Sequence, residues 1–552
     1  MRRVLGDILD EARQAFARQA WSVARSAYAS AIDQAPLTLD DIERHAIAAH
    51  LVGEEAESHD LLKRGYREAL ERKDVTRAVR FAFWLGHSMV FTGELAQANG
   101  WFARARNLLT ERGADCVEWG YLLIPVGLEQ LMAGDAETAC STFTEAKVIG
   151  GRFADPDLLA IAGHLRGRAL IQLGRAGEGM AELDEVMVAA TAGELSPLLV
   201  GHVYCGVLQA CWEVFDLRRA REWTAALSRW CEGQPDLVPY RGPCLVHRVE
   251  LMRLRGDWED ALEEARRACE WLSLPASPEG PADAFYQLGE LYRLRGDWAA
   301  ADAAYRQASR FGRPPEPGIA LLWLARGQAH AAAAAIGRIL DEAGADHAKR
   351  SELLAAYVVI LLALGDTAAA RTTTIELAHL AATLDALPLR ALADRAEGSV
   401  LIAEGETRAA LAPLRRSWMA WQQLEVPYEA ARVRVLISAA CRALGDEESA
   451  AMELDAARWV FERLGAVYDL APLDADSASL APAAASGLTR REIEVLTFIA
   501  AGETNKAIAA ALVISEHTVA RHVQNMLQKL GFASRTSLAA FAVEQGLARR
   551  SA

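Results

Sequence analysis

The sequence predicts an all-α protein, in which a long helical-repeat solenoid is followed by a small module of four helices. Strand signals are almost absent, whereas leucine and alanine recur at spacings of three and four along the chain. Gly-Asp or Gly-Glu dipeptides recur at intervals of 40 residues, for example at Gly365, Gly405 and Gly445. From Leu488 onward, residues that start and end helices return at short intervals. Together these patterns favour stacked helical hairpins and then a compact helical domain.

The glycine dipeptides predict where the hairpins turn. Each glycine is expected to end one helix in the left-handed conformation, and the acidic residue after it to begin the next helix. A fixed period of this size is typical of a solenoid. About eleven hairpins would fit between residues 5 and 465.

One unit, residues 284–308, shows how the repeat packs. Small residues stand where two helices approach closely, and aromatic residues fill the holes between them: Leu288, Gly289, Tyr292, Ala301, Tyr305 and Ala308. This unit resembles the tetratricopeptide repeat. The repeats near residues 370, 410 and 450 keep the alanine and lose the aromatic residue, so they are tetratricopeptide-like. These stripes are interpreted as packing between helices, and the solenoid is expected to offer a concave groove for a peptide, a protein or a small effector.

Charge is distributed unevenly along the chain. The 552 residues carry a net charge of −15, which argues against a protein coated in nucleic acid. From Leu488 to the end, however, eight Lys/Arg stand against five Asp/Glu, a net of +3, which leaves −18 on the preceding residues. Basic character is therefore concentrated at the C-terminus.

Several classes of protein are disfavoured by what the sequence lacks. The eight cysteines form no C-x-x-C pair, so neither a zinc site nor a disulfide framework is predicted. The longest apolar run, residues 353–364, is too short to span a bilayer, and the N-terminus lacks an apolar signal core. No lysine follows a glycine, which excludes a G-x-x-x-x-G-K-[ST] phosphate loop. We therefore expect a cytoplasmic protein with no membrane segment, no cofactor and no metal.

The predicted domains are a solenoid at 1–465, a flexible linker at 466–487 and a C-terminal module at 488–552. The linker prediction rests on a composition rich in alanine, serine, aspartate and proline. Within the module, capping residues predict four short helices. The first helix is expected to start at a capping box of Thr489 and Glu492 and to end at Gly502. The other three are expected to run from Thr504 to Leu512, from Ser515 to Gly531 and from Ser534 to Gly546.

The third helix of the module has two different faces. Apolar residues recur at spacings of four, three and four and predict a buried stripe: Val519, Val523, Met526 and Leu530. The residues left facing outward are polar, basic or small: His517, Ala520, Arg521, Gln524 and Gln528. Such a face on the second helix of a helix-turn-helix suits the major groove of DNA. Hydroxyl, amide and ammonium groups nearby suit phosphates: Thr504, Asn505, Lys506, Ser515 and Thr518.

The module closely resembles the LuxR-type helix-turn-helix over about 60 residues. The family's L-T-x-R-E-x-E-V-L is matched by Leu488, Thr489, Arg491, Glu492, Glu494, Val495 and Leu496. The later segments are matched by Gly502, Thr504, Asn505, Lys506, Ile508, Ala509, Ile514, Ser515, Thr518, Val519, His522, Asn525, Lys529, Leu530, Gly531 and Arg535. Thr504 replaces the family's usual serine, and Ala520 stands where the family usually has lysine.

The resemblance implies sequence-specific binding to double-stranded DNA by a homodimer. The implied DNA contacts include Asn525, Lys529 and Arg535 in addition to the residues above, and Arg521 is the first choice for reading a base. The fourth helix is implied at or near the dimer contact, through Leu538, Phe541 and Ala542. His517 and His522 are five residues apart, which is the wrong spacing for one metal on a helix face, and His522 is interpreted as a packing histidine.

The predicted function is a transcriptional regulator whose solenoid senses an effector or a protein partner. The stretch 428–466 is similar to the helical-repeat region of large ATP-binding LuxR regulators, but ATP-driven switching is not expected because the phosphate loop is missing. The alternative is an interaction scaffold whose working surface is the solenoid. An enzyme is the weakest prediction, since no ordered set of nucleophile, base and orienting residue stands out.

Overall fold

The structure is a computed structural model that describes residues 2–32, 37–113, 115–273, 281–342, 347–473, 488, 490–512, 515–532 and 534–544. Every regular element in these ranges is a helix, so the all-α prediction is confirmed. The chain divides into two compact units, residues 1–460 and 461–552. In the described ranges no helix is both long and apolar enough to cross a membrane.

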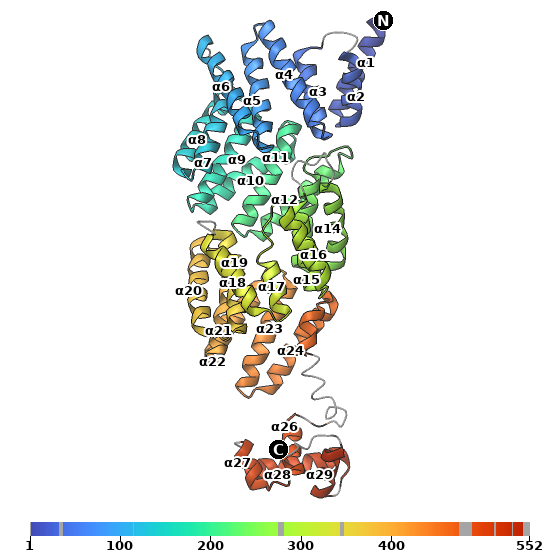
Figure 1. The fold of residues 1–552 in the computed structure, drawn as a ribbon, viewed down its shortest axis with the longest axis vertical. Helices are drawn as coiled ribbons and strands as arrows, with labels where there is room; N and C mark the ends of the chain where they lie inside the picture. The colour runs from blue at the N-terminus through green and yellow to red at the C-terminus, as the bar shows by residue number, and fades with distance from the viewer. Residues whose placement is uncertain are drawn as a thin grey trace. The chain divides into compact units, whose positions relative to one another are not determined.

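The first unit is a tetratricopeptide-like solenoid of helical hairpins (Figure 1). Helices α1 to α24 pair in chain order into twelve hairpins in the described ranges, against about eleven expected. The first six hairpins are α1 (Arg2–Ala17), α2 (Trp21–Ile32), α3 (Leu39–Leu51), α4 (Glu55–Glu71), α5 (Val75–Phe91), α6 (Leu95–Arg112), α7 (Glu118–Met132), α8 (Ala136–Phe153), α9 (Pro156–Gln172), α10 (Ala176–Ala192), α11 (Pro197–Glu213) and α12 (Leu217–Glu232).

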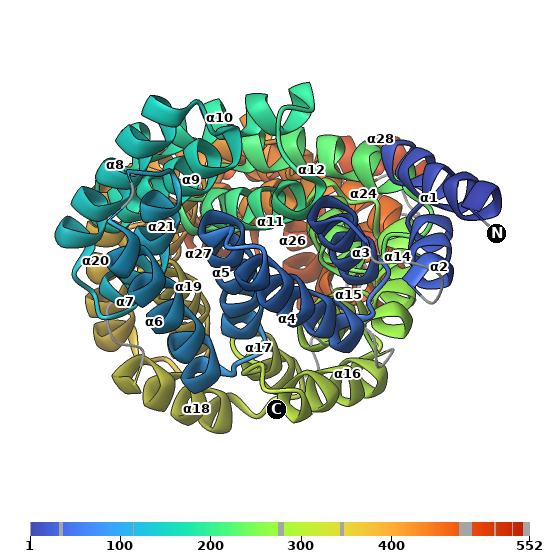
Figure 2. The same cartoon turned by 90° about the horizontal axis from the view of Figure 1, so that it is seen from above.

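The remaining hairpins continue the same alternation up to the end of the solenoid. They are α13 (Arg241–Arg255), α14 (Trp258–Leu272), α15 (Ala282–Leu294), α16 (Trp298–Arg310), α17 (Gly318–Ala325), α18 (Ala329–Glu342), α19 (His347–Ala363), α20 (Thr367–Leu384), α21 (Leu387–Ala403), α22 (Thr407–Gln423), α23 (Pro427–Ala443) and α24 (Glu447–Leu464). In Figure 2 odd-numbered helices such as α5, α11, α15 and α19 lie on the inside of the curve, and even-numbered helices such as α8, α10, α18 and α20 lie outside.

The predicted turn signals work as expected at several hairpins. Gly296 and Gly365 have φ angles of 80° and 77°. Asp297 and Asp366 then cap the next helix, because each carboxylate accepts a hydrogen bond from the backbone N–H three residues further on, at 3.1 and 3.0 Å. No such side-chain bond is made at two other predicted starts, Asp257 and Glu406.

A glycine facing an aromatic ring sets the spacing between the two helices of a hairpin. A Cβ at Gly86 would lie 2.7 Å from the ring of Phe102, and one at Gly289 would lie 2.7 Å from the ring of Tyr305. Both rings are almost fully buried. In the α21–α22 hairpin Leu414 takes the place of the ring, against Gly398, in agreement with the predicted loss of the aromatic residue.

Two glycines of the α5–α6 hairpin test this packing. We expect Gly86→Ala to lower the free energy of unfolding by about 1–2 kcal/mol, because the clash with Phe102 outweighs the gain in helix propensity. Gly100→Ala is the matched control on α6, where a Cβ would meet nothing within 4 Å. It is expected to raise the free energy of unfolding by about 0.5–1 kcal/mol. Denaturant unfolding followed by circular dichroism measures both, and equal signs for the two variants would contradict the role of the close approach.

Successive turns of the solenoid contact one another. The indole Nε1 of Trp21 donates a hydrogen bond to Oε1 of Gln234 at 2.8 Å, although the two residues are 213 apart in sequence. Further along, Nη2 of Arg221 donates to the carbonyl oxygen of Leu424 at 2.5 Å, across 203 residues. Trp258 packs edge-on against Tyr428, with ring centroids 5.2 Å apart. These contacts close the curve of helices, so the inner face of the solenoid is partly enclosed.

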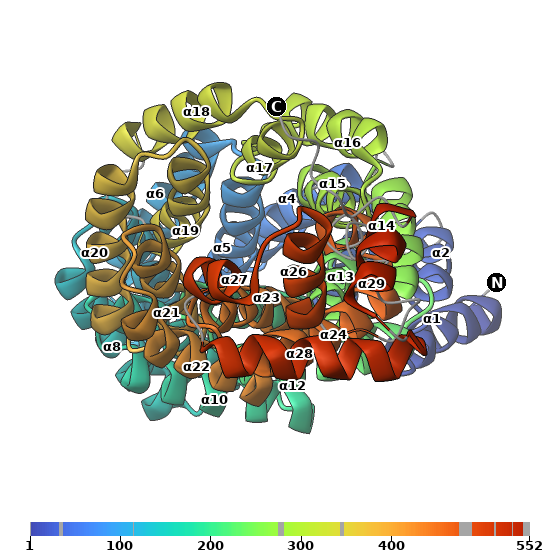
Figure 3. The same ribbon diagram turned by 90° about the horizontal axis from the view of Figure 1, so that it is seen from below.

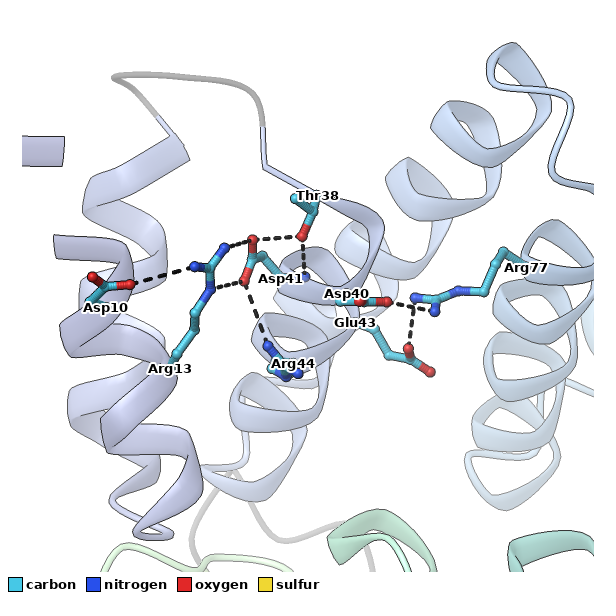
Figure 4. A network of polar contacts seen from close by, with 8 residues as sticks. All are labelled: Asp10, Arg13, Thr38, Asp40, Asp41, Glu43, Arg44 and Arg77. Atoms are coloured by element: carbon cyan, nitrogen blue, oxygen red, sulfur yellow. Dashed lines mark hydrogen bonds and ion pairs between the residues drawn. The ribbon is translucent and has the colours of Figure 1, made fainter. Parts of the chain in front are cut away.

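Ion pairs connect neighbouring hairpins at the N-terminal end (Figure 4). Arg13 of α1 donates from Nε and Nη2 to the two carboxylate oxygens of Asp41 on α3, each at 2.9 Å, and the hydroxyl of Thr38 donates to the same carboxylate at 2.6 Å. Burial raises the pKa of Asp41, but the bonds from Arg13 and Thr38 outweigh it and hold this pKa below its usual value. Arg77 of α5 reaches Asp40 on α3 at 2.6 Å. The first helices of three successive hairpins, α1, α3 and α5, are thereby linked.

Four helices of the second unit match the predicted module. They are α26 (Arg490–Ala500), α27 (Asn505–Leu512), α28 (Glu516–Leu530) and α29 (Arg535–Glu544). The predicted linker at 466–487 differs in its first part, because residues 467–473 are helical. Residues 474–487 and Thr489 lie outside the described residues.

Candidate nucleic-acid interface

Helices α26 to α29 surround a small apolar core. Each helix contributes to it, through Leu488, Val495, Leu496, Ile499, Ile508, Ala509, Val519, Met526, Leu538 and Ala542. In Figure 3 the helices α26, α27 and α29 lie on one side of α28. The predicted stripe of α28 therefore faces inward, with Val519 and Met526 fully buried. The opposite face of α28 is left to carry polar side chains.

Hydroxyl caps fix the two helices of the helix-turn-helix. Ser515 accepts a hydrogen bond from the backbone N–H of Thr518 at 3.0 Å, and the two hydroxyls lie 2.7 Å apart. Thr504 accepts from the N–H of Ala507 at 3.2 Å. Ser515 and Thr504 remain exposed, so each keeps hydrogen-bonding capacity beyond the cap. Gly531 ends α28 with a φ angle of 69°.

The predicted reading face is exposed. The side chains of His517, Ala520, Arg521, Gln524, Asn525 and Gln528 are all exposed on α28. Arg521 and Gln524 are three residues apart, so they are neighbours on one face of the helix. Within the described residues neither side chain has a hydrogen bond or an ion pair. A guanidinium and a carboxamide are thus presented side by side, and these groups make two-point contacts with guanine and adenine.

Lys529 has an internal partner, which the sequence did not reveal. Its Nζ donates to Oε2 of Glu492 at 2.7 Å. The carboxylate of Glu492 is 3% exposed and the side chain of Lys529 is 39% exposed. The residue predicted as a DNA contact therefore also links α28 to α26. Glu492, predicted as part of a capping box, serves as its anchor.

Arg535 and Asn505 also bind each other. Nη1 of Arg535 donates to Oδ1 of Asn505 at 2.6 Å, and Nη2 donates to the carbonyl oxygen of Glu503 at 2.6 Å. These bonds join the start of α29 to the start of α27. Lys506, by contrast, is exposed and has no partner in the described residues. Among the predicted phosphate contacts it is the basic side chain that is available for a ligand.

Arg491 is a further residue whose role sequence reasoning missed. Its Nη2 donates to the carbonyl oxygen of Leu512 at 2.8 Å, and its Nη1 pairs with Glu494 at 2.6 Å. The carbonyl lies at the C-terminal end of α27, where helix carbonyl groups lack partners within the helix. Arg491 thus holds the end of α27 against α26. The match of Arg491 to the family pattern was the available signal.

Two of the three residues predicted at the dimer contact lie in the core of the module. Leu538 and Ala542 are 0% exposed, because they pack in the core of the module and are covered by its own helices. Phe541 is half-buried, and its ring centroid lies 5.5 Å from that of Phe532. The exposed face of α29 instead carries Thr536, Ala540 and Val543. The dimer contact was implied by the resemblance to the LuxR-type module, whereas Leu538 and Ala542 serve the core of the module.

No metal site is formed by the described side chains. They contain no group of three or more His, Cys, Asp or Glu placed to hold a metal ion. His522 is half-buried beside the apolar stripe of α28, and His517 is exposed.

The chain thus combines a tetratricopeptide-like solenoid with a helix-turn-helix module that has an exposed polar second helix. Residues 486–542 match the model of the luxR family of bacterial regulatory proteins. The C-terminal module is a LuxR-type helix-turn-helix domain.

Curated relatives are similar to this chain over the same module. The uncharacterized transcriptional regulatory protein YhcZ of Bacillus subtilis is 62% identical over 60 residues, which cover 11% of this chain and 28% of YhcZ. The transcriptional regulatory protein LiaR of the same organism is 47% identical over 55 residues, which cover 10% of this chain and 26% of LiaR. The DNA-binding transcriptional activator DevR/DosR of Mycobacterium tuberculosis is 44% identical over 59 residues, 11% of this chain and 27% of that protein. The chain spans about a quarter of the length of these relatives.

Among solved structures, the APC/C hetero-tetramer Cut9–Hcn1 contains a chain that aligns with 97% of this chain. The alignment covers 95% of that chain, with 13% sequence identity and a TM-score of 0.44.

Proposed function

We propose that this protein is a sequence-specific, DNA-binding transcriptional regulator. The observation that carries the proposal is the exposed face of α28, where Arg521 and Gln524 stand side by side without partners in the described residues. A helix of this kind fits the major groove, and its two side chains supply the groups that distinguish base pairs. Lys506 and the hydroxyls of Thr504 and Ser515 would contact phosphates. The LuxR-type identity of the module supports this assignment.

The division of labour we propose places the sensor in the solenoid. Residues 1–465 would bind an effector or a protein partner, 466–487 would connect the two parts, and 488–552 would bind the operator. A solenoid offers an extended inner surface for ligands. Its part in regulation would be to alter operator binding when that surface is occupied.

Dimerisation on DNA would use the exposed face of α29. Val543 is 57% exposed, and Thr536 and Ala540 lie on the same face. Small and apolar side chains allow two helices to approach closely. A dimer of this kind would bind two half-sites whose symmetry mirrors that of the protein.

Genome-wide immunoprecipitation of the full chain tests the proposal, with Arg521→Ala/Gln524→Ala as the comparison. Discrete promoter peaks that disappear in the double variant would support a sequence-specific regulator. An inverted repeat beneath the peaks would support the dimer, and a single unrepeated site would contradict it. An absence of peaks in every growth condition, with proteins still co-purifying on the solenoid, would favour an interaction scaffold instead.

A further inference from the structure

The inner face of the solenoid contains a cavity of about 210 Å³ between α13 and α23. Its walls come from six consecutive inner helices, α13, α15, α17, α19, α21 and α23. The cavity exists because the curve of helices closes: α13 contacts α23, and Trp258 packs on Tyr428. It lies entirely within the first unit. A space of this size suits a small molecule and is too small for a folded partner.

The walls of the cavity combine apolar side chains with an unusual number of charged ones. Five arginines line it, Arg253, Arg293, Arg313, Arg395 and Arg432. Four glutamates accompany them, Glu250, Glu290, Glu352 and Glu429. Five positive and four negative charges give a net of +1, although the whole chain carries −15. Arg313 also pairs with Asp283, which lies outside the lining. The positive charge available to a ligand therefore comes from arginines that share a glutamate.

Two of the glutamates are each shared between two arginines. Glu290 pairs with Arg293 at 2.7 Å and lies 4.0 Å from Arg253, and Tyr305 donates its hydroxyl proton to Glu290 at 2.5 Å. Burial raises the pKa of Glu290, but these arginines and the tyrosine outweigh it and hold the pKa at about 2. This carboxylate therefore stays ionised. Because one ionised glutamate faces two arginines, each such group carries one net positive charge.

The second shared glutamate, Glu429, pairs with Arg395 and, at 3.3 Å, with Arg432. It lies on α23, whereas Glu290 lies on α15, so the two excess positive charges come from different walls of the cavity. Carboxylates and phosphates are the groups that arginine binds best, through two parallel N–H donors.

Glu352 on α19 differs from the other glutamates of the cavity. Its side chain borders the open space of the cavity but is enclosed there by the surrounding helices, and in the described part of the chain it has no hydrogen bond and no ion pair. Glu250, by comparison, accepts a hydrogen bond from Gln287 at 2.6 Å. A carboxyl group without a protein partner in a charged cavity has hydrogen-bonding capacity left for a ligand.

We propose that this cavity binds a small organic oxyanion, a carboxylate or a phosphate ester, between the arginines and Glu352. Arg253 and Arg313 would contact the anionic group, and the O–H of Glu352 would donate a hydrogen bond to it. In the proposed function the solenoid senses an effector, and this cavity would be the effector site. Only the regulatory role of the bound anion rests on that proposed function. Anion binding itself does not depend on DNA binding.

The protonation of Glu352 sets the expected pH dependence. Burial raises the pKa of Glu352 to about 7, the nearby carboxylates of Glu250 and Glu290 add to the rise, and Arg313 and Arg253 oppose it. The charged groups that line the cavity around Glu352 are Glu250 and Arg253 on α13, Glu290 and Arg293 on α15, Arg313 before α17, Arg395 on α21, and Glu429 and Arg432 on α23. Helices α18 and α20 contribute no residue to the lining.

A bound anion favours the protonated form of Glu352, so binding takes up a proton. The protonated fraction of a group with a pKa of about 7 falls about tenfold from pH 6 to pH 8. Affinity for the anion is therefore expected to fall about tenfold over this interval. A ligand that placed an ammonium group against Glu352 would show the opposite trend.

Calorimetric titration of the full-length protein tests the proposal at pH 6 and pH 8. The probes are acetate, succinate, citrate, inorganic phosphate and glycerol 3-phosphate, with succinamide and glycerol as neutral controls. At least one anion is expected to bind about tenfold more weakly at pH 8, while the neutral controls do not bind. Glu352→Gln is expected to bind the same anion with little pH dependence, because the amide donates a hydrogen bond at either pH. Arg313→Ala is expected to lose about tenfold or more in affinity.

Two control variants separate the cavity from general effects of charge. Glu270→Gln on α14 and Arg310→Ala on α16 remove exposed charges outside the cavity, and both are expected to bind the anion as the unchanged protein does. Circular dichroism checks whether Arg313→Ala is folded. If Arg313→Ala does not fold, the pH dependence of anion binding by Glu352→Gln still tests the proposal. Absence of binding by every anion at pH 6 would overturn the proposal, and so would tighter binding at pH 8. A failure to find promoter peaks would overturn the DNA-binding function and leave this result unaffected.

Discussion

The double variant Arg521→Ala/Gln524→Ala is expected to bind the operator between about 30-fold and about 20,000-fold more weakly than the unchanged protein. Each two-point contact between a side chain and a base discriminates by about 1–3 kcal/mol, and two such contacts are removed. Both side chains are exposed on α28 and outside the core of the module, so the variant is expected to fold normally. Fluorescence anisotropy with the operator recovered from promoter peaks measures the loss.

Binding to unrelated DNA provides the internal control for this prediction. Non-specific affinity comes mostly from phosphate contacts, so the double variant is expected to keep most of it and to show a similar dependence on salt. The matched control is Gln307→Ala/Arg310→Ala on α16 of the solenoid. It removes an exposed glutamine and an exposed arginine that have the same spacing of three residues. It should leave operator binding unchanged. An equal loss on operator and unrelated DNA would mean that these two side chains contact phosphates and read no base.

Local sequence patterns predicted the helices of the module and the outward face of α28. Spacing of apolar residues and capping signals act over a few positions, so they are readable from one sequence. Ser515 and Gly531 begin and end α28 as predicted, and the φ angle of 69° at Gly531 agrees with its expected role. The resemblance to the LuxR-type module placed Leu538 and Ala542 of α29 at the dimer contact. Neither the resemblance nor the local patterns could show whether these side chains face the core of the same chain or a second copy.

Contacts between residues far apart in sequence were not predictable in this way. The bond between Trp21 and Gln234 joins residues 213 apart, and its existence depends on how small rotations accumulate over many hairpins. The enclosed cavity follows from that accumulation. Each charged residue in it, such as Glu352, looks in sequence like an ordinary surface residue of an amphipathic helix. The period of the repeat therefore predicts the class of fold but not the closure of the curve.

The variant Lys529→Met tests whether this predicted DNA contact mainly stabilises the fold of the module. Lys529→Met keeps the alkyl chain and removes the ammonium group that pairs with Glu492. Removing the charged partner of a buried carboxylate lowers the free energy of unfolding by about 1–3 kcal/mol. The lower part of this range applies because solvent reaches Lys529. We expect amide hydrogen exchange in α26 and α28 to accelerate about fivefold or more in the full-length variant. Mass spectrometry of peptides from the two helices measures this change.

Two further variants show whether the effect comes from the ion pair. Glu492→Gln combined with Lys529→Met should restore much of the protection, because a neutral amide replaces the unpaired carboxylate. Lys506→Ala is the matched control, since Lys506 is exposed and has no partner in the described residues. It should leave exchange unchanged while lowering the number of counterions released on DNA binding by about one. If Lys529→Met instead leaves exchange unchanged and lowers counterion release as Lys506→Ala does, the ammonium group of Lys529 serves DNA and not the module. The ion pair with Glu492 would then be exchanged for a phosphate when DNA binds.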